Sequence, residues 1–471
     1  MRKLTVAVAL MAAALPAGAK VSLNPMVGDN MVLQQSAAAT LWGTAAPGTT
    51  VEITPSWSDI ATTVKADKSG KWKAEVETPK GSFNKYSITF TDKSDNDTVR
   101  VSNVLTGEVW LASGQSNMQM PLKGYPGCCV KDGYDEIAAA GKRADSVRFI
   151  TVPLTQSYTP LDTVAASWQV PSSATAPEFS ALCWALAGRM SDVLGVPVGI
   201  VSAAYGGAKV ESWLPREILE GYDDVSLDPA DIDKMVHYYR PMLMYNAMFV
   251  PLKDYTYKGI LWYQGCSNTD SWQTYADRLA TMVSHWRQEI GEGDIPFYAV
   301  EIGPFDYNNG QAAYLREAQW DAIDRIPHSG MISITDLVAS YERFNIHPEQ
   351  KKEVGNRLCN LILNQTYGHK EFPVKHPRFK SLAVEGNKAR VTLDVSEDGI
   401  CRNYGIEGFE LAGEDRQFHP AKATSVEGND IILVADEVDS PRYVRYCFGD
   451  FKLGNVYGGN YLPLIPFRSD R

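Results

Sequence analysis

The sequence predicts an α/β domain with a mainly parallel sheet, placed between two β-rich regions. Residues 20–104 alternate apolar and polar side chains with a period of two, as half-buried antiparallel strands do. Residues 105–372 instead alternate short apolar runs with segments of helical period, which is typical of βα units. The period of two returns from residue 373 to 471. We therefore predict an N-terminal β-sandwich domain, a central α/β domain and a C-terminal β-rich domain over these three ranges.

Residues 1–19 have the features of a secretory signal peptide. Met1-Arg2-Lys3 is basic, Leu4 to Leu15 is an apolar run, and Ala17-Gly18-Ala19 offers small residues for cleavage. No cysteine follows the cleavage site, which argues against a lipid anchor. No later stretch approaches the roughly 18 apolar residues of a membrane span. We expect a protein without a membrane span that is exported to the periplasm or secreted.

The charge balance and the cysteines exclude several classes of protein. The chain has 45 Lys and Arg against 56 Asp and Glu, a net charge of −11, which argues against a nucleic-acid or anionic-membrane partner. An acidic substrate would therefore need a local cation. The seven cysteines are odd in number and show no Cys-x-x-Cys spacing. We expect no metal, no cofactor and no disulfide on which the fold depends.

The two β-rich regions are predicted from alternating runs bounded by turn residues. In the N-terminal region the expected strands lie at 50–54, 71–76, 86–90 and 98–101. In the C-terminal region they lie at 380–384, 389–393, 430–434 and 443–446. The run Val384-Glu-Gly-Asn-Lys388 is a hairpin-turn candidate between two of these strands.

In the central region, strands and helices are expected to alternate. Leu182, Leu186, Met190 and Val193 recur at helical spacing within residues 178–194. Further helices are expected at 275–290, 315–326 and 349–363, and strands at 109–111, 196–203, 259–263, 296–300 and 331–335. Ligands of such sheets bind outside the carboxyl ends of the strands, so the residues that follow each strand are the candidates for a functional site.

Four strand ends carry residues suited to acyl transfer. Ser116 follows the first strand in Gly114-Gln-Ser-Asn117, where a helix N-terminus would favour developing negative charge; an ordinary N-cap is the alternative interpretation. Gly206-Gly207 follows the second strand and Gln264 the third. Asp336 follows a later strand, with His347 in the loop before the last helix.

Together these residues supply what ester cleavage needs. Ser116 would be the nucleophile and His347 the base that takes its proton. The oxyanion would be held by the Ser116 N–H, the Gly206 N–H, with Gly207 as an alternative, and the Gln264 amide. The histidine also needs an acceptor at its second nitrogen.

Several sequence blocks resemble the sialate O-acetylesterase family of SGNH hydrolases. The blocks are Gly107-Glu-Val-Trp, Gly114-Gln-Ser-Asn-Met118, Gly206-Gly207, Glu211-x-Trp213, Trp262-Tyr-Gln-Gly265, Leu315-Arg-Glu-Ala-Gln319, Ile346-His-Pro348, Val354-Gly355 and Leu462 to Arg468. The resemblance implies a flavodoxin-like three-layer catalytic domain flanked by β domains, and metal-independent removal of O-acetyl groups from sugars. By position it makes Ser116 the nucleophile and His347 the base, with Gly206 and Gln264 in the oxyanion hole.

The chain departs from the family pattern at two points. Cys266 stands where the family usually has a glutamate, which either alters substrate choice or simply fills space. Asn345 and Phe344 occupy the positions where an aspartate often precedes the histidine. The third member of the triad is therefore open among Asp336, Glu342 and a backbone carbonyl.

The family resemblance makes O-acetylated sialic acid the first substrate to consider. Its carboxylate would need a cation, and Arg316 and Lys209 are the candidates near the matched blocks. Acetylated xylan or another acetylated glycan is the alternative substrate. A non-catalytic glycan-binding protein is the alternative of a different class, and a lipase is a third, which the absence of Gly-x-Ser-x-Gly disfavours.

Overall fold

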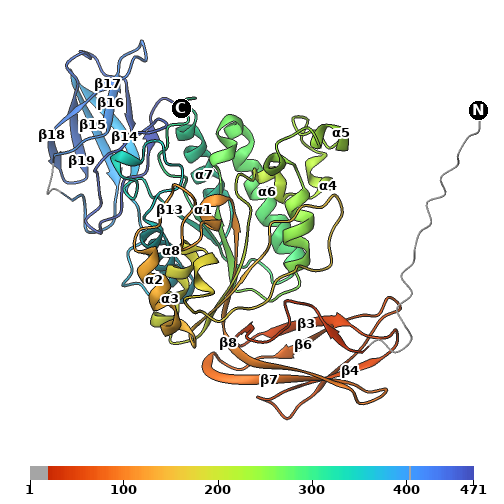
Figure 1. The fold of residues 1–471 in the computed structure, drawn as a ribbon. Coiled ribbons are helices and arrows are strands. Elements are labelled where there is room, and N and C mark those ends of the chain that lie inside the picture. The colour runs from red at the N-terminus through yellow and green to blue at the C-terminus, as the bar shows by residue number, and fades with distance from the viewer. Residues whose placement is uncertain (1–19, 402–404) are drawn as a thin grey trace, which may run out of the picture.

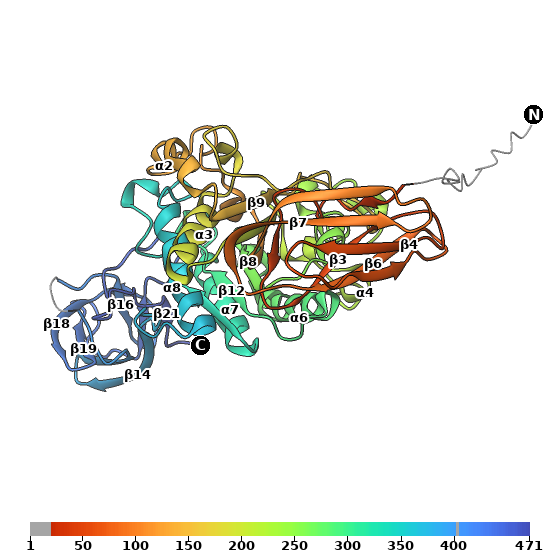
Figure 2. The same cartoon turned by 90° about the horizontal axis from the view of Figure 1, so that it is seen from below.

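A computed structural model describes residues 20–401 and 405–471 of the chain (Figure 1). The expected signal peptide, residues 1–19, lies outside the described residues. The fold is mixed α/β, with one large mixed sheet and three smaller β-sheets. The N-terminal and C-terminal β regions lie on opposite sides of the helix-covered centre (Figures 1 and 2).

In the N-terminal region a small sheet packs beside strands of the large sheet. The small sheet has the order β1-β3-β6, and the large sheet contributes β5-β4-β7-β8 together with β2, which pairs with β8. Their bounds are β1 Ser22–Leu23, β2 Val32–Gln34, β3 Ala38–Thr44, β4 Thr50–Pro55, β5 Thr62–Lys65, β6 Lys71–Glu77, β7 Ser82–Asp92 and β8 Thr98–Gly114. The predicted strands of this region are present.

Strand β8 belongs to both the N-terminal and the central part of the large sheet. Its first half pairs antiparallel with β7 and parallel with β2. Its second half pairs parallel with β10 and β11, and every residue from Val104 to Gly114 is buried. One uninterrupted strand therefore leads from the β region to the turn that carries Ser116.

The central strands form a parallel sheet in the order β9-β10-β8-β11-β12-β13. Their bounds are β9 Val147–Thr151, β10 Val198–Ala204, β11 Gly259–Tyr263, β12 Phe297–Val300 and β13 Ser329–Ile332. Because all six run the same way, their carboxyl ends meet at one edge, where the loops after β8, β10 and β11 lie together.

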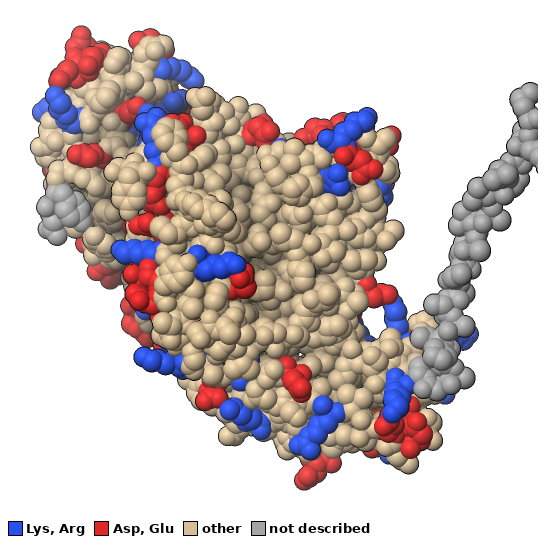
Figure 3. Space-filling model, viewed as in Figure 1, with Lys and Arg blue, Asp and Glu red and all other residues tan. Residues whose placement is uncertain are grey.

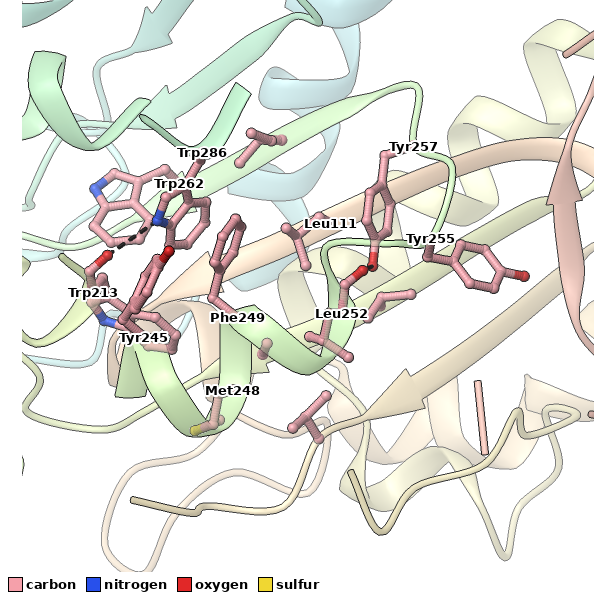
Figure 4. Packing of buried hydrophobic residues seen from close by; sticks show 14 of the residues in the cluster. Leu111, Trp213, Tyr245, Met248, Phe249, Leu252, Tyr255, Tyr257, Trp262 and Trp286 are labelled. Carbon is pink, nitrogen blue, oxygen red and sulfur yellow. Dashed lines mark hydrogen bonds between the residues drawn. The ribbon is translucent and has the colours of Figure 1, made fainter. Parts of the chain in front are cut away.

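Helices cover both faces of this parallel sheet. On one face Trp110 packs in a core with residues of α3 (Ala181–Leu194) and α8 (Lys351–Tyr367). On the other, its neighbour Leu111 packs in a core with α6 (Trp272–Ile290) and α7 (Ala312–Arg325), where Trp286 lies among aromatic rings (Figure 4). Adjacent strand residues point to opposite faces, so a continuous apolar run serves both cores.

The shorter helical segments lie in the connections. They are α1 Ser116–Gln119, α2 Gly133–Ala139, η1 Ala140–Arg143, η2 Ala176–Glu178, η3 Val210–Trp213, α4 Arg216–Leu219, α5 Pro229–Ile232, η4 His237–Tyr239, η5 Tyr245–Phe249, η6 Val250–Leu252, η7 Cys266–Ser271 and η8 Ser340–Glu342. Among the long helices, α3 begins where the Ser180 hydroxyl accepts the Cys183 N–H, and it ends at Gly195, which has a positive φ.

The C-terminal region contains two four-stranded sheets around its own core. The sheets have the orders β14-β15-β19-β18 and β17-β16-β20-β21. Their bounds are β14 Arg378–Glu385, β15 Lys388–Asp394, β16 Phe409–Ala412, β17 His419–Pro420, β18 Lys422–Glu427, β19 Asp430–Val434, β20 Tyr443–Tyr446 and β21 Phe467–Arg468. Glu385 pairs with Lys388, which confirms the predicted hairpin.

The four long helices predicted in the central region are present, with ends that differ from the prediction by at most four residues. Within residues 20–401 and 405–471, no helix is long and apolar enough to cross a membrane.

Candidate active site

Ser116 stands on a sharp turn between β8 and α1. Gly114, which ends β8, has a φ of +134°, and a Cβ there would lie 2.2 Å from the carbonyl oxygen of Tyr263. Only glycine therefore lets β8 end so closely against β11. The Gln115 N–H donates to the same carbonyl at 2.9 Å, and Ser116, the first residue of α1, is left half-exposed.

His347 lies against Ser116. Its Nε2 is 2.9 Å from the Ser116 Oγ, although the two residues are 231 positions apart. The His347 N–H donates to the Asn345 side chain at 3.1 Å, which fixes the loop locally. The Asn117 amide donates to the Ile346 carbonyl at 2.9 Å and so links the serine turn to the histidine loop. Ser116 and His347 are thus held together by one hydrogen bond within the histidine loop and one between that loop and the serine turn.

Two further side chains support this arrangement. The buried Lys351 Nζ donates to the Asn117 Oδ1 at 2.6 Å and so fixes which way that amide faces. The Tyr125 hydroxyl donates to the Ser116 carbonyl at 3.1 Å, and its ring meets the His347 ring edge-on at 5.1 Å. Burial lowers the pKa of Lys351 to about 7.

The His347 imidazole is in the neutral form that a proton acceptor requires. Burial lowers the pKa of His347 to about 4, and the Lys351 ammonium acts in the same direction. At neutral pH the ring is therefore uncharged and can take the Ser116 proton as the hydroxyl attacks.

The pH dependence of the reaction follows from this shift. The folded-state pKa of His347 lies below the ordinary 6.5, so the neutral form persists as the pH falls. We expect the acid limb of kcat/KM for 4-nitrophenyl acetate to have its midpoint at about pH 4. Replacing Lys351 with methionine removes a nearby positive charge and is expected to move that midpoint upward. A wild-type midpoint near 6.5 would contradict the expectation.

The structure does not bring Asp336 to the histidine, which corrects its predicted role. Both Asp336 carboxylate oxygens accept from Arg357, at 2.7 and 2.8 Å. Glu342 is also engaged, because its two oxygens accept the backbone N–H groups of Ala339 and Glu349 at 2.9 Å each. Neither carboxylate bonds to the His347 ring. The geometry is that of a Ser–His pair braced through the backbone.

Asp336 is expected to contribute to stability instead. Its carboxylate is 5% exposed and its partner Arg357 13%, so Asp336→Asn leaves a largely buried guanidinium without its counter-charge. We expect a loss of about 3 kcal/mol in the free energy of unfolding, measured by urea denaturation. Asp324→Asn, at the exposed pair with Arg378, is the matched control and should cost less than about 1 kcal/mol. A kcat loss without destabilisation would instead point to contact with His347.

Two backbone donors lie beside the Ser116 hydroxyl. The Ser116 N–H is at the start of α1, where the helix does not use it. Gly206 lies opposite, since a Cβ built on it would be 3.6 Å from the Ser116 Cβ. Its N–H donates to the Gln119 Oε1 at 2.9 Å. An oxyanion at this point would take the place of that side-chain oxygen.

Gln264 does not face the site, contrary to its predicted role. It is fully buried, and its amide nitrogen donates to the Ala208 carbonyl at 3.0 Å and to the Asn268 Oδ1 at 2.7 Å. Its Oε1 accepts from the Tyr275 hydroxyl at 3.0 Å. Both amide hydrogens are used, so Gln264 instead supports the loop that carries Gly206.

The two predicted substrate cations are also engaged. Arg316 is 1% exposed, and it donates to the carbonyls of Cys447 at 3.2 Å and Gly449 at 2.6 Å, which joins α7 to the C-terminal region. The structure therefore corrects its assignment to substrate. Lys209 follows Gly206-Gly207 and is partly exposed, but its Nζ is 3.1 Å from the Asp270 carboxylate.

Cys266 is a buried thiol behind the nucleophile. Burial raises its pKa, while the ammonium of Lys351 acts in the opposite direction. The thiol is therefore protonated at neutral pH and supplies no negative charge to Lys351. Among the described residues, no group of three or more His, Cys, Asp and Glu side chains could hold a metal ion.

Among the residues that the sequence prediction missed are Asn117 and Lys351, which hold the histidine loop, and Gln119, which binds the Gly206 N–H. Asn117 and Gln119 follow the serine in the same motif, and that proximity was the available signal. Lys351 lies four residues after His347, but a lysine at the start of a helix gives no sign that it will be buried.

Comparison with known proteins identifies the family of the chain. Residues 106–364 match the model of the family described as carbohydrate esterase, sialic acid-specific acetylesterase. The mouse sialate O-acetylesterase is 27% identical, with 94% of this chain and 93% of the mouse protein covered. The human protein is also 27% identical, over 87% of this chain and 84% of its own.

A solved structure is similar over nearly the whole chain. It is a carbohydrate acetylesterase from Xanthomonas citri, with 30% identity, a TM-score of 0.84, and coverage of 96% of this chain and 100% of that one. Members of the matched family are esterases that remove O-acetyl groups from sugars. The chain belongs to this family of sialic acid-specific acetylesterases among the carbohydrate esterases, and it is an esterase.

Proposed function

We propose that the protein removes O-acetyl groups from sugars through an acetyl-Ser116 intermediate. The observation that carries the proposal is the 2.9 Å contact between the Ser116 Oγ and an imidazole held neutral by its surroundings. The half-exposed Ser116 hydroxyl and the adjacent Gly206 backbone give an acetyl ester room and a donor.

The reaction has two steps. In the first, the Ser116 Oγ attacks the acetyl carbon while His347 Nε2 takes its proton; the tetrahedral oxyanion accepts from the N–H groups of Ser116 and Gly206. The C–O bond to the sugar then breaks, and His347 returns the proton to the departing sugar oxygen. In the second, His347 takes a proton from the water that attacks the acetyl-serine. The bond between the acyl carbon and the Ser116 Oγ then breaks, His347 returns the proton to that oxygen, and acetic acid and free Ser116 result.

The backbone of the Ile346–His347 segment takes the orienting role usually given to a carboxylate. Asn117 fixes the Ile346 carbonyl, and Lys351 fixes Asn117. This proposal replaces Asp336 and keeps the backbone alternative of the sequence analysis. It predicts a base whose orientation depends on packing and hydrogen bonds more than on a buried negative charge.

The parallel sheet with helices on both faces is consistent with an SGNH hydrolase core. We propose that residues 105–372 form this catalytic domain, with β domains at 20–104 and 373–471. Export after cleavage of residues 1–19 remains part of the proposal, on the sequence features of that segment.

Sialic acid and uncharged sugars are the two substrate classes to separate. The family resemblance favours O-acetylated sialic acid. However, Arg316 is buried and Lys209 is paired, so neither predicted cation is free for the sialate carboxylate. The contacts therefore favour acetylated sugars without a carboxylate group.

The test is acetate release from O-acetylated sialic acids and acetylated xylo-oligosaccharides, together with rapid quenching during turnover of 4-nitrophenyl acetate. We expect the peptide that contains Ser116 to carry one acetyl group at early times. Turnover without any acetylated peptide under single-turnover conditions would argue for direct attack by water. Sugar binding without acetate release would instead indicate a non-catalytic glycan-binding protein.

A further inference from the structure

A group of aromatic rings extends outward from the Gly206–Gly207 loop. We call His237, Tyr238 and Tyr239 of η4, together with Tyr205, the aromatic shelf. Neighbouring ring centroids are 6.1 Å apart for Tyr205 and His237, 4.9 Å for His237 and Tyr238, and 4.7 Å for Tyr238 and Tyr239. His237 and Tyr239 are exposed, and Tyr239 is 38% exposed. Tyr205 is buried and Tyr238 partly exposed, so His237 and Tyr239 supply the ring surface that solvent reaches.

The shelf is attached directly to the reaction site. A Cβ built on Gly207 would lie 2.6 Å from the Tyr238 ring, so that ring lies against the backbone next to Gly206. The Tyr205 N–H donates to the Gly114 carbonyl at 3.1 Å, at the end of β8. Gly206, between them, is in contact range of Ser116. A sugar bound on the aromatic shelf could therefore carry the acetyl group that is cleaved at Ser116.

The shelf is also fixed in place before any ligand arrives. The Gln156 amide donates to the His237 carbonyl at 2.6 Å, and the Tyr239 N–H donates to the Val236 carbonyl at 2.8 Å. The Lys209 ammonium lies 5.2 Å from the centre of the Tyr239 ring. A surface ordered in advance loses little conformational entropy on binding.

A cavity of about 280 Å³ adjoins the shelf. Tyr239 and Lys209 form part of its wall, with Val225, Met235 and Pro241 as apolar and Ser226 and Ser271 as hydroxyl neighbours. Aromatic and apolar walls with a few polar groups are what small-ligand sites usually offer. A pyranose ring has apolar C–H faces and hydroxyl edges, and it matches both parts of this surface.

The cations of the cavity are already paired. Its two cations are Lys209 and Arg278; Lys209 is paired with Asp270, and Arg278 with Glu211 and Asp224. The Arg278 side chain is 2% exposed, so it is not available to a ligand. A ligand carboxylate would find two carboxylates in the wall, Glu211 and Asp224, and no unpaired cation. Over the whole face drawn in Figure 3, charged side chains are few in the middle.

We propose that the aromatic shelf and the adjoining cavity form a subsite that stacks an uncharged pyranose ring of the acetylated glycan. The inference rests on the proposed esterase function, because it places the sugar whose acetyl group Ser116 would remove. Tyr239 is the residue that touches both the shelf and the cavity, and Asp270 is the residue that excludes anionic sugars by neutralising Lys209.

The charge preference is tested with a matched substrate pair: O-acetylated N-acetylneuraminic acid and its methyl ester. The methyl ester lacks the negative charge and carries one additional methyl group. We expect the wild type to prefer the methyl ester by about tenfold in kcat/KM, and Asp270→Asn to reduce that preference to about twofold, because it frees the Lys209 cation. Equal rates for acid and ester in the wild type, or a preference for the acid, would overturn the proposal.

The stacking role is tested with Tyr239→Ala. We expect KM for the methyl ester to rise about tenfold with little change in kcat, and a smaller effect on 4-nitrophenyl acetate, which has no sugar ring. Phe83→Ala is the matched control, since Phe83 is a similarly exposed ring, at 45%, in the N-terminal sheet. Equal KM changes for both substrates, or in both variants, would refute the subsite.

A binding measurement keeps this test separate from the esterase proposal. Titration of the deacetylated methyl ester, followed by NMR, reports the subsite without turnover. We expect Tyr239→Ala to raise Kd about tenfold and Phe83→Ala to leave it unchanged. If Tyr239→Ala selectively loses binding of the deacetylated methyl ester while the protein releases no acetate, the subsite is supported and the esterase proposal is refuted. If the protein releases acetate while Tyr239→Ala binds this ligand as the wild type does, the esterase proposal is supported and the subsite is refuted.

Discussion

Ser116→Ala is expected to lower kcat for acetylated sugars and for 4-nitrophenyl acetate by about 10⁴-fold or more. The substitution removes the one oxygen that His347 Nε2 contacts, and with it the covalent route. KM should change little, because the oxyanion donors Ser116 N–H and Gly206 N–H are backbone groups that remain. Acetate release under initial-rate conditions provides the measurement.

The control for Ser116→Ala is Ser102→Ala, at a second Ser-Asn pair, exposed in the N-terminal half of β8. It should retain wild-type kcat. The thermal midpoint of both variants should stay close to that of the wild type, because neither hydroxyl supports the core. A Ser116→Ala protein that keeps more than about a hundredth of wild-type kcat would exclude the proposed nucleophile.

His347→Ala is expected to lower kcat by about 10⁴-fold, and the double variant with Ser116→Ala should be no worse than either single one. Groups that act as one unit lose their joint contribution when either is removed. Added free imidazole should restore part of the activity of His347→Ala and none of the double variant.

His369→Ala is the control for the base, since His369 is bonded to Glu371 away from Ser116 and should leave kcat unchanged. Additive losses in the double variant would show that Ser116 and His347 act separately. Such a result would contradict the mechanism even if both single variants were slow.

The strand-end rule accounts for the parts of the site that the sequence predicted. The sequence analysis located Ser116, Gly206 and His347 from the residues at which the apolar runs end. The carboxyl ends of parallel strands meet at one edge of the sheet. Gln264 follows β11 as predicted, yet its side chain turns inward. Gly265, with a φ of +151°, redirects the chain there, and sequence periodicity carries no information on such a turn.

The failures at Asp336 and Arg316 have a common physical cause. Each was assigned from its neighbours in sequence, but its partner comes from elsewhere: Arg357 on α8 for Asp336, and the carbonyls of Cys447 and Gly449 for Arg316. A charged residue binds the complementary group that packing brings within reach. Helix and strand patterns predicted the layers but not which polar side chains meet across them.

The predicted division into three domains rests on changes of the hydrophobic period near residues 104 and 373. What the pattern did not reveal is that β8 crosses the first of these positions without a break. A change of the hydrophobic period marks a change in what surrounds the chain, and a single strand can extend from one environment into the other.

The continuity of β8 leaves no hinge between the N-terminal sheet and the serine turn. Its residues 104–114 are buried without interruption, so no flexible joint lies where two domains would otherwise swivel. The N-terminal sheet and the serine turn are therefore expected to move together. Under the proposed function, an acetylated glycan would have to shift along the protein surface to bring each acetyl group to Ser116.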